Sequence, residues 1–353
     1  MARNSNLSKA KSAKNDEFYT QMTDIEKELR HYKEHFKNKI IFCNCDDPEW
    51  SNFWRYFELN FDHLGLKKLI STHFDREKPS YKLELYRDID GSLKTLKTSL
   101  KQNGDFRSEE CVEMLKECDV VVTNPPFSLF REYVGLLMEY GKKFVILGNM
   151  NAITYKEIFP LIKDNKIWPG YGFNKTMEFE VPENYKAKRI AENGKRYTKV
   201  PAITWYTNLD IKKRHEPLIL YREYHGHEDE YPHYDNYDAI NVDKTKDIPM
   251  DYIDVMGVPI SFLDKFCPEQ FEIVGLLQSS TDEQAGIKNL RYYDNFKEMR
   301  QDMSYTGASG KKANGNPVLA GKSVKGNFLY CNETNQYVHS LYARIVIRIK
   351  YRE

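Results

Sequence analysis

Residues 120 to 127 read Val120-Val121-Val122-Thr123-Asn124-Pro125-Pro126-Phe127, a β-branched run that ends at an amide, two prolines and an aromatic ring. A continuous apolar run of this kind is typical of a strand that is buried on both faces of a parallel sheet. Pro125 lacks an N–H group, so strand pairing must stop there. The stretch therefore predicts an open α/β sheet that delivers Asn124 and Phe127 to its carboxyl edge, where such sheets bind ligands.

The tetrapeptide after this strand has the groups needed to hold an exocyclic amine. The side-chain oxygen of Asn124 and the carbonyl of Pro125 can both accept hydrogen bonds from an NH₂ group. The ring of Phe127 offers a stacking face. An amine held in this way becomes a nucleophile. A strand followed by an ordinary Pro-Pro turn is the alternative interpretation of the same four residues.

The Asn-Pro-Pro-Phe segment resembles the catalytic loop of the amino-methyltransferases, which transfer a methyl group from S-adenosylmethionine to N6 of adenine, N4 of cytosine or a glutamine amide. Its form is most similar to that of the adenine enzymes. The resemblance implies a catalytic set made of Asn124, Pro125, Pro126 and Phe127. It also implies S-adenosyl-L-methionine as the cofactor.

Strand and helix patterns alternate along the first half of the chain. Strands are expected at residues 40–43, 68–72, 120–123 and 143–147, and helices at 23–36, 50–61, 108–116, 129–140 and 155–164. This alternation predicts an α/β fold with a doubly wound, mostly parallel sheet, the Rossmann-like fold of class I methyltransferases. Residues 176–181 and 202–207 are expected to pair antiparallel at the sheet edge. The polar stretch 76–103 is interpreted as an insertion.

The composition of the chain changes near residue 215, after which Tyr, His and acidic residues dominate to about residue 254. We therefore expect a basic N-terminal arm at 1–15, a catalytic domain at 16–215 and a target-recognition, DNA-binding region at 216–353. The last region contains five glycines between Gly307 and Gly326, followed by an apolar alternating strand near 343–349.

Bulk composition is that of an ordinary soluble protein, with 353 residues, 41% of them apolar and 30% charged. No stretch approaches the roughly 20 apolar residues that span a bilayer, and the N-terminus has no apolar core of a signal peptide. Cytoplasmic localisation without membrane attachment is expected. The six cysteines include no C-x-x-C pair and no spacing typical of zinc, so neither disulfides nor a metal site is expected.

The net charge is only +1, but the two ends of the chain are basic. Residues 1–15 contain four Lys/Arg and no acid, and residues 286–353 contain twelve Lys/Arg against five Asp/Glu. Basic ends can contact DNA phosphates, with an affinity that falls as salt rises. The residues predicted to bind DNA are Arg3, Lys9, Lys11, Lys14, Lys311, Lys312, Lys322 and Lys325. Merely solvated lysines are the alternative, above all for the N-terminal arm.

The loop after the first strand is the expected place for the methionine part of the cofactor in a class I methyltransferase. It reads Cys43-Asn44-Cys45-Asp46-Asp47-Pro48, without the usual glycines, and Asn44, Asp46 and Asp47 are the candidate contacts. An Asp-Pro turn that caps the following helix is the alternative.

Two further segments are candidates for the cofactor pocket. Asp105 could accept a hydrogen bond from the cofactor's adenine amine while Phe106 covers the adenine ring, although Asp105 or Ser108 could instead cap a helix. Phe18, Tyr19 and Thr20 resemble the pocket-lining segment that precedes the first strand in several groups of adenine methyltransferases. Asn15 or Asp16 could equally cap the helix that follows.

Seven segments together resemble the EcoRI-type adenine-specific DNA methyltransferase family. They are residues 14–20, 43–48, 104–108, 121–133, 153–157, 234–241 and 256–260, and the resemblance covers residues 3 to 275. It implies methylation of adenine N6 in a specific sequence of duplex DNA, by base flipping and direct in-line attack.

The same resemblance implies the modification enzyme of a restriction-modification system. We expect it to act as a monomer or weak dimer alongside a cognate restriction endonuclease. Two alternatives remain open. One is the same chemistry on RNA or on a protein glutamine, and the other is a nucleic-acid-binding module with a catalytically dead methyltransferase fold.

Overall fold

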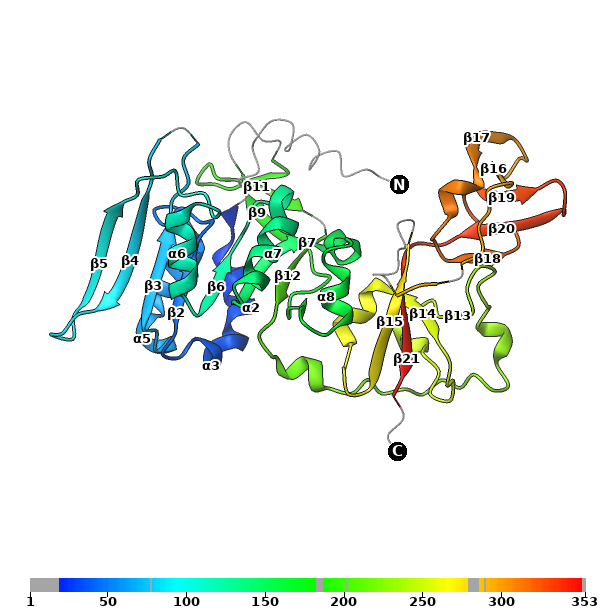
Figure 1. Cartoon of the computed structure of the whole chain (residues 1–353), viewed down its shortest axis with the longest axis horizontal. Coiled ribbons are helices and arrows are strands. Elements are labelled where there is room, and N and C mark those ends of the chain that lie inside the picture. Colours follow the sequence, from blue (N-terminus) through cyan, green and yellow to red (C-terminus); the bar gives the residue numbers. More distant parts are fainter. Residues whose placement is uncertain are drawn as a thin grey trace. The chain divides into compact units, whose positions relative to one another are not determined.

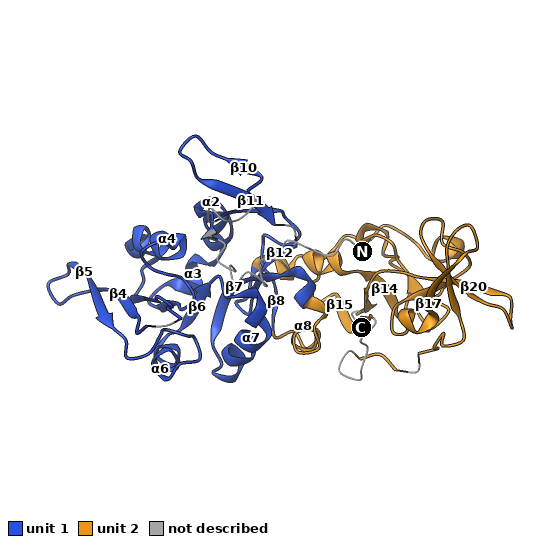
Figure 2. Cartoon of the chain, turned by 90° about the horizontal axis from the view of Figure 1, so that it is seen from above, with its two compact units in different colours: residues 1–152, 167–211 blue, residues 153–166, 212–353 orange. Residues whose placement is uncertain are grey.

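The computed structural model describes residues 19–76, 78–181, 187–200, 202–278, 286–288 and 290–350. Their chain forms two compact units (Figure 2). Unit 1 contains the described residues up to Ala152 together with Ile167–Ile211, and unit 2 contains Ile153–Lys166 and the chain from Lys212 onward. Among the described residues, no helix is both long enough and apolar enough to cross a membrane.

Unit 1 is built on an eight-stranded mixed sheet with the strand order β5-β4-β3-β2-β6-β7-β12-β8 (Figure 1). Its strands are β2 (Ile40–Cys43), β3 (Lys68–Thr72), β4 (Tyr81–Arg87), β5 (Leu93–Ser99), β6 (Val120–Thr123), β7 (Lys143–Asn149), β8 (Trp168–Pro169) and β12 (Ile203–Thr207). The four central strands β3, β2, β6 and β7 are parallel, as the β-branched runs predict. Strand β12 pairs antiparallel with β7, which confirms the expected antiparallel partner at this side.

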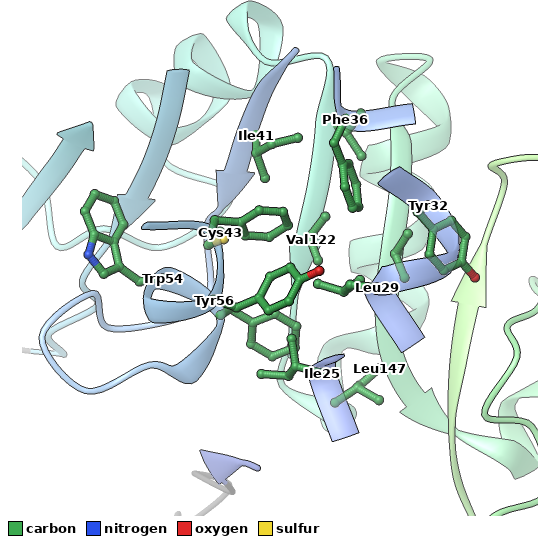
Figure 3. Packing of buried hydrophobic residues seen from close by; sticks show 14 of the residues in the cluster. Ile25, Leu29, Tyr32, Phe36, Ile41, Cys43, Trp54, Tyr56, Val122 and Leu147 are labelled. Carbon is green, nitrogen blue, oxygen red and sulfur yellow. The ribbon is translucent and has the colours of Figure 1, made fainter. Parts of the chain in front are cut away.

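Helices cover both faces of these parallel strands, so β2 and β6 are buried along their whole length. The helices of this unit are α2 (Met22–Leu29), η1 (Arg30–Tyr32), α3 (Lys33–Phe36), α4 (Asn52–Leu59), α5 (Phe61–Leu64), α6 (Glu109–Glu117), η2 (Phe127–Leu129) and α7 (Phe130–Glu139). Figure 2 shows the strands between α2 and α4 on one side and α6 and α7 on the other. Figure 3 shows Ile25 and Leu29 of α2 packed with Ile41 of β2 and Val122 of β6.

The stretch 76–103 is more regular than the insertion that its polarity suggests. It forms the hairpin β4–β5, which extends the main sheet antiparallel beyond β3. Leu83 and Leu85 alternate with polar residues on β4, and Leu85 is buried while β5 is exposed throughout. Because the edge strand β5 is exposed along its whole length and β4 buries only Glu84 and Leu85, the hairpin needs few apolar residues, which explains the polar composition.

The expected pairing of residues 176–181 with the main sheet is wrong. Strand β9 (Met177–Glu180) belongs to a separate four-stranded sheet with β1 (Tyr19–Thr20), β11 (Arg196–Val200) and β10 (Arg189–Ile190). Residues 196–200, for which no strand was expected, pair antiparallel with β9. Because β1 pairs with β9, this sheet also brings Thr20 into unit 1.

Unit 2 contains two further sheets. One has the order β13-β14-β21-β15, with β13 (Ile240–Asn241), β14 (Met256–Pro259), β15 (Phe271–Leu277) and β21 (Arg344–Ile349), the strand expected near 343–349. The other has the order β17-β16-β19-β20-β18, with β16 (Lys297–Met299), β17 (Tyr305–Ser309), β18 (Val318–Ala320), β19 (Phe328–Cys331) and β20 (Gln336–Ser340).

Short helices complete the chain, and α8 (Phe159–Lys163) is shorter than the helix expected at 155–164 because Pro160 stands in its first turn. The remaining ones are η3 (Met150–Thr154), η4 (Lys212–His215), η5 (Glu228–Glu230), η6 (Thr245–Asp247), η7 (Ile260–Lys265) and η9 (Gly310–Ala313).

Two of the family-like segments in unit 2 meet in its core. The hydroxyl of Tyr234 donates to Asn241 Oδ1 at 2.9 Å and to the carbonyl of Gly257 at 3.3 Å. A Cβ atom on residue 257 would lie 2.1 Å from that hydroxyl oxygen, so the close approach requires glycine. The segments 234–241 and 256–260 therefore hold the fold of unit 2 together.

Candidate active site

The candidate site lies at the carboxyl edge of β2 and β6. These strands are parallel neighbours, while the chain leaves β2 for β3 on its other side. The loops after Cys43 and after Thr123 consequently emerge at the same edge, at the point where the strand order reverses. This is where open α/β sheets place their ligands.

Asp46 joins the two loops. Its Oδ2 atom accepts hydrogen bonds from the Thr123 hydroxyl and from the backbone N–H of Asn124, the latter at 3.2 Å. Its Oδ1 atom accepts from Ser51 Oγ at 3.1 Å. The backbone N–H of Cys45 donates to Thr123 Oγ1 at 3.1 Å, which adds a second link. The loop that was expected to bind cofactor is thus fixed to the Asn-Pro-Pro-Phe loop.

The position of Asp46 between the two loops also changes the pKa of its carboxyl group. Burial raises its pKa to about 6, although the hydrogen bonds from Thr123, Asn124 and Ser51 favour the ionised form. Asp46 therefore carries a negative charge at neutral pH and loses it in mild acid.

Asn44 is held on the other side of the same loop. Its side chain is buried, and its Oδ1 atom accepts a hydrogen bond from the hydroxyl of Tyr133 on α7. Its Nδ2 group has no hydrogen-bond partner among the described residues. The ring of Phe106 packs edge-on against Tyr133, with centroids 5.0 Å apart. Asn44 and Phe106, which are 62 positions apart in the sequence, are therefore connected through one tyrosine.

Thr20 is linked to the site by a hydrogen bond to α4. Its backbone carbonyl accepts from Asn52 Nδ2 at 2.7 Å, next to Ser51, which binds Asp46. Its Oγ1 atom is buried and, within the described part of the chain, has no hydrogen-bond partner. The backbone of Tyr19 pairs with Glu180, whereas Phe18 lies outside the described residues, as do the DNA-binding candidates Arg3, Lys9, Lys11 and Lys14.

Asp47 points toward the β4–β5 hairpin. Its Oδ1 atom accepts from the hydroxyl of Tyr81 and from the backbone N–H of Glu49, both at 3.0 Å. Lys97 of β5 lies with its Nζ atom 3.8 Å from the centre of the Tyr81 ring and 2.7 Å from Glu49 Oε1. The alternative reading as a turn is partly correct, since Asp47 closes the turn while Ser51 caps α4.

Asp105 is paired within its own loop. Its carboxylate accepts from Arg107 Nε at 2.8 Å and Nη2 at 2.7 Å, and this hydrogen bonding lowers the pKa of Asp105. Ser108 caps α6 by accepting from the backbone N–H of Cys111 at 3.3 Å. The helix-capping alternative is therefore correct for Ser108, and contact of Asp105 with a cofactor stays a prediction.

The Asn-Pro-Pro-Phe loop continues directly from β6 into η2. Pro125 is buried, whereas Asn124, Pro126 and Phe127 are partly exposed. The ring of Phe127 also packs against the main core of unit 1. The backbone N–H of Leu129 donates to the carbonyl of Pro126 at 2.9 Å, which closes the turn. The loop is therefore anchored at both ends, with the Oδ1 atom of Asn124 buried and the ring of Phe127 partly exposed.

The four candidate lysines of the tail belong to unit 2. Lys311 and Lys312 lie in η9, and Lys322 and Lys325 lie in the turn between β18 and β19. All four are exposed. Lys312 Nζ lies 3.4 Å from Glu298 Oε1, and Lys322 Nζ lies 4.5 Å from the centre of the Tyr337 ring.

Several residues of the site were missed in the sequence. Thr123, Ser51, Tyr133 and Tyr81 bind the predicted residues but carry no motif of their own. Ser51 could have been found as the helix-capping serine before an aromatic run. Thr123 could have been found as the one hydroxyl at the end of an apolar strand. Tyr81 and Tyr133 give no comparable signal.

The mixed α/β sheet with an Asn-Pro-Pro-Phe loop at its carboxyl edge is the arrangement of the adenine-specific methyltransferases. The family described as "Adenine-specific methyltransferase EcoRI" matches residues 6–350, and the chain belongs to this family. The match confirms the resemblance and the predicted class of enzyme, an adenine-specific DNA methyltransferase. It also extends the family to the tail beyond residue 275, where the sequence resemblance ended.

The relatives agree with this assignment. The chain is 51% identical over 301 residues to the type II methyltransferase M.EcoRI of Escherichia coli, covering 78% of this chain and 90% of that protein. It is 44% identical over 280 residues to the type II methyltransferase M.MpnI of Mycoplasma pneumoniae, covering 77% and 85%. No solved structure matches the chain.

Proposed function

We propose that unit 1 binds S-adenosyl-L-methionine and transfers its methyl group to N6 of adenine in a specific sequence of duplex DNA. The fold would be the doubly wound class I methyltransferase fold, with target recognition by the region that follows. One observation carries the proposal: Asp46 accepts hydrogen bonds from both Thr123 and the backbone of Asn124, so a single carboxylate couples the cofactor loop to the catalytic loop.

The residues present fit this cofactor. Asn44 Nδ2 and Thr20 Oγ1 are buried polar groups without partners among the described residues, and such groups cost about 1–3 kcal/mol unless a ligand or water satisfies them. When bound, the cofactor supplies an electrophilic methyl group on a positively charged sulfonium. The ionised Asp46 would favour that positive charge. The complete proposed set is Phe18, Tyr19, Thr20, Asn44, Asp46, Asp47, Asp105 and Phe106.

The catalytic loop would hold the target base. Asn124 Oδ1 and the carbonyl of Pro125 would accept hydrogen bonds from the N6 amine, which favours a pyramidal nitrogen aimed at the methyl group. Phe127 would stack on the adenine, contributing about 1–3 kcal/mol toward the few kcal/mol needed to flip the base out of the duplex. Pro126 would fix the bend between these groups. Positioning and electrostatics supply the rate, and no general base needs to act before attack.

The wider setting follows from the same assignment. Arg3, Lys9, Lys11 and Lys14 would contact DNA phosphates, as would Lys311, Lys312, Lys322 and Lys325. The enzyme would act in the cytoplasm as a monomer or weak dimer. It would protect DNA against a cognate restriction endonuclease.

Mapping modified bases tests the proposed function. We expect purified enzyme with labelled S-adenosyl-L-methionine to methylate adenine N6 in one short sequence of duplex DNA, read out by sequencing of the modified bases and by mass spectrometry of nucleosides. Labelled RNA, or a labelled glutamine in a protein, would favour the alternative substrates. Cofactor binding without any transfer would favour the catalytically dead module.

The Tyr81–Asp47 hydrogen bond suggests a positioning role for the β4–β5 hairpin. We expect Tyr81→Phe to raise the KM for S-adenosyl-L-methionine about threefold to tenfold, the cost of one hydrogen bond of about 0.5–1.5 kcal/mol, while kcat stays unchanged. Tyr86→Phe is the matched control, because Tyr86 lies opposite Lys68 at the other end of the same strand pair. Equal KM values for the two variants would contradict the role.

A further inference from the structure

The five-stranded sheet of unit 2 has one face that the proposed function leaves without a role. Lys297 of β16 pairs with Tyr330 of β19, and Tyr330 pairs with Tyr337 of β20. Directly paired residues point to the same side of a sheet. The residues that alternate with them, Leu329 and Val338, are buried with Tyr293 in a separate core cluster. The two tyrosines and the lysine are therefore directed away from that core.

Aromatic rings and ammonium groups form a continuous surface on this side. The rings of Tyr330 and Tyr337 are stacked, with centroids 4.7 Å apart and an interplanar angle of 26°. Lys322 Nζ lies 4.5 Å from the Tyr337 ring and 5.4 Å from that of Phe328. Lys297 Nζ lies 6.0 Å from the ring of Tyr305, which is 50% exposed. The ring of Phe328 is buried and does not belong to the surface itself. We call Lys297, Tyr305, Lys322, Tyr330 and Tyr337 the tyrosine face.

The Gly/Lys-rich turn between β18 and β19 holds Lys322 in this position. Gly321 adopts a φ of 91°, which favours glycine, and its N–H donates to the carbonyl of Tyr337 at 2.6 Å. Gln301 Nε2 donates to the carbonyls of Ser323 and Gly326 at 3.1 and 2.6 Å. The turn is therefore fixed by hydrogen bonds to β20 at one end and to the turn between β16 and β17 at the other, which gives Lys322 a defined position.

The charge on this sheet is complementary to a polyanion. Residues 297 to 340 contain six Lys/Arg against three Asp/Glu. Within the five strands, all of them described, Glu298 is the only acidic residue. It pairs with Leu329 on the opposite side and accepts from Thr306 Oγ1 at 2.7 Å. The tyrosine face itself is therefore basic and aromatic, without a carboxylate.

We infer that the tyrosine face is a DNA-docking surface. Lys297 and Lys322 contact phosphate oxygens, and Tyr330 and Tyr337 lie against deoxyribose or base rings, the combination by which basic aromatic surfaces bind nucleic acids. Among the described residues, no carboxylate forms an ion pair with Lys297 or Lys322. A protein partner would therefore have to bury both ammonium groups, which is costly unless it supplies carboxylates for them. The inference deepens the proposed function by naming where the tail holds DNA.

The double variant Lys297→Ala/Lys322→Ala tests the face. We expect a weaker affinity for a short DNA duplex and a plot of log K against log salt that is shallower by about two, since each phosphate contact contributes about 0.9. The KM for DNA should rise in parallel with the loss of affinity. Lys297→Arg/Lys322→Arg should retain the wild-type slope. The matched control is Lys244→Ala/Lys246→Ala, which removes the same charge from exposed lysines of unit 2.

A second variant tests the rings. Tyr330→Leu keeps an apolar side chain but removes the flat ring, so we expect about fivefold weaker binding or more with an unchanged salt slope and an unchanged thermal midpoint. A slope for Lys297→Ala/Lys322→Ala equal to that of the control variant would overturn the inference. The inference would also be overturned if Lys297→Ala/Lys322→Ala weakened binding to a protein more than it weakened binding to DNA. Duplex binding is measured without methyl transfer, so an enzyme that binds DNA here but methylates nothing would refute only the proposed function.

Discussion

Replacing Asn124 by alanine is expected to lower the rate of methyl transfer by a factor of at least about 10²–10³, the usual effect of removing one preorganised hydrogen-bonding group from a reacting centre. The affinity for S-adenosyl-L-methionine should stay within a few-fold of wild type. The structural reason is that Asn124 contacts Asp46 through its backbone N–H, at 3.2 Å, which alanine retains. Single-turnover rates and cofactor binding, measured on the same preparation, check both parts.

Asn124→Asp is the matched variant. It keeps an acceptor oxygen in the same place, so it should retain more activity than Asn124→Ala. Its carboxylate lies close to that of Asp46, however, and like charges disfavour joint ionisation. Its rate should therefore depend more steeply on pH than the wild-type rate. Normal turnover by Asn124→Ala would remove the assigned role, and an equal loss of cofactor affinity and rate would indicate a structural role instead.

The parallel core could be predicted from the sequence because its signal is local. The strands Val120–Thr123 and Ile40–Cys43 have the predicted bounds, since strands covered on both faces need continuous apolar residues. Strands with one exposed face gave a weaker signal. The hairpin β4–β5 and strand β11 contain mostly polar residues and were not recognised as strands.

The sequence predicted where the residues of the site lie, but it did not predict which residues they contact. Placement after the first strand was enough to select Asp46, but its hydrogen bonds to Thr123 and Asn124 cross 77 and 78 positions of the chain. Such pairs depend on how strands are ordered in the sheet. The pairing of Asp105 with Arg107 is local, yet the sequence alone did not distinguish it from a free carboxylate that could meet a ligand.

In the region after residue 286, the sequence showed the composition but not the arrangement of the side chains. Its charge and glycines were visible in the sequence, but the tyrosine face depends on a register that places Tyr330 between Lys297 and Tyr337. Lys322 was selected for its charge alone. The structure adds that it lies over the rings of Tyr337 and Phe328, which gives it a defined place beside the aromatic surface.

Asp46→Asn removes the ionisable carboxyl group of Asp46 and keeps a side chain of nearly the same shape. Burial raises the pKa of Asp46 from 3.8 to about 6, so its ionisation opposes folding. That cost is absent below about pH 4 and reaches at most about 3 kcal/mol above pH 6, at 1.36 kcal/mol for each pKa unit. The stability of the variant relative to wild type should therefore increase from pH 4.5 to pH 7.5, as urea denaturation at a series of pH values would measure.

The activity of Asp46→Asn should decrease although its stability at neutral pH increases. The variant lacks the negative charge that would favour a sulfonium, and an amide cannot accept from all three donors of Asp46, so we expect cofactor affinity to fall about tenfold to a hundredfold, or about 1.5–3 kcal/mol. For wild type, kcat/KM for the cofactor should fall as pH drops below about 6, because Asp46 becomes protonated. The variant should lack this acid limb. If both proteins kept the same limb, another group would have to carry it, and Asp46 would have only a structural role.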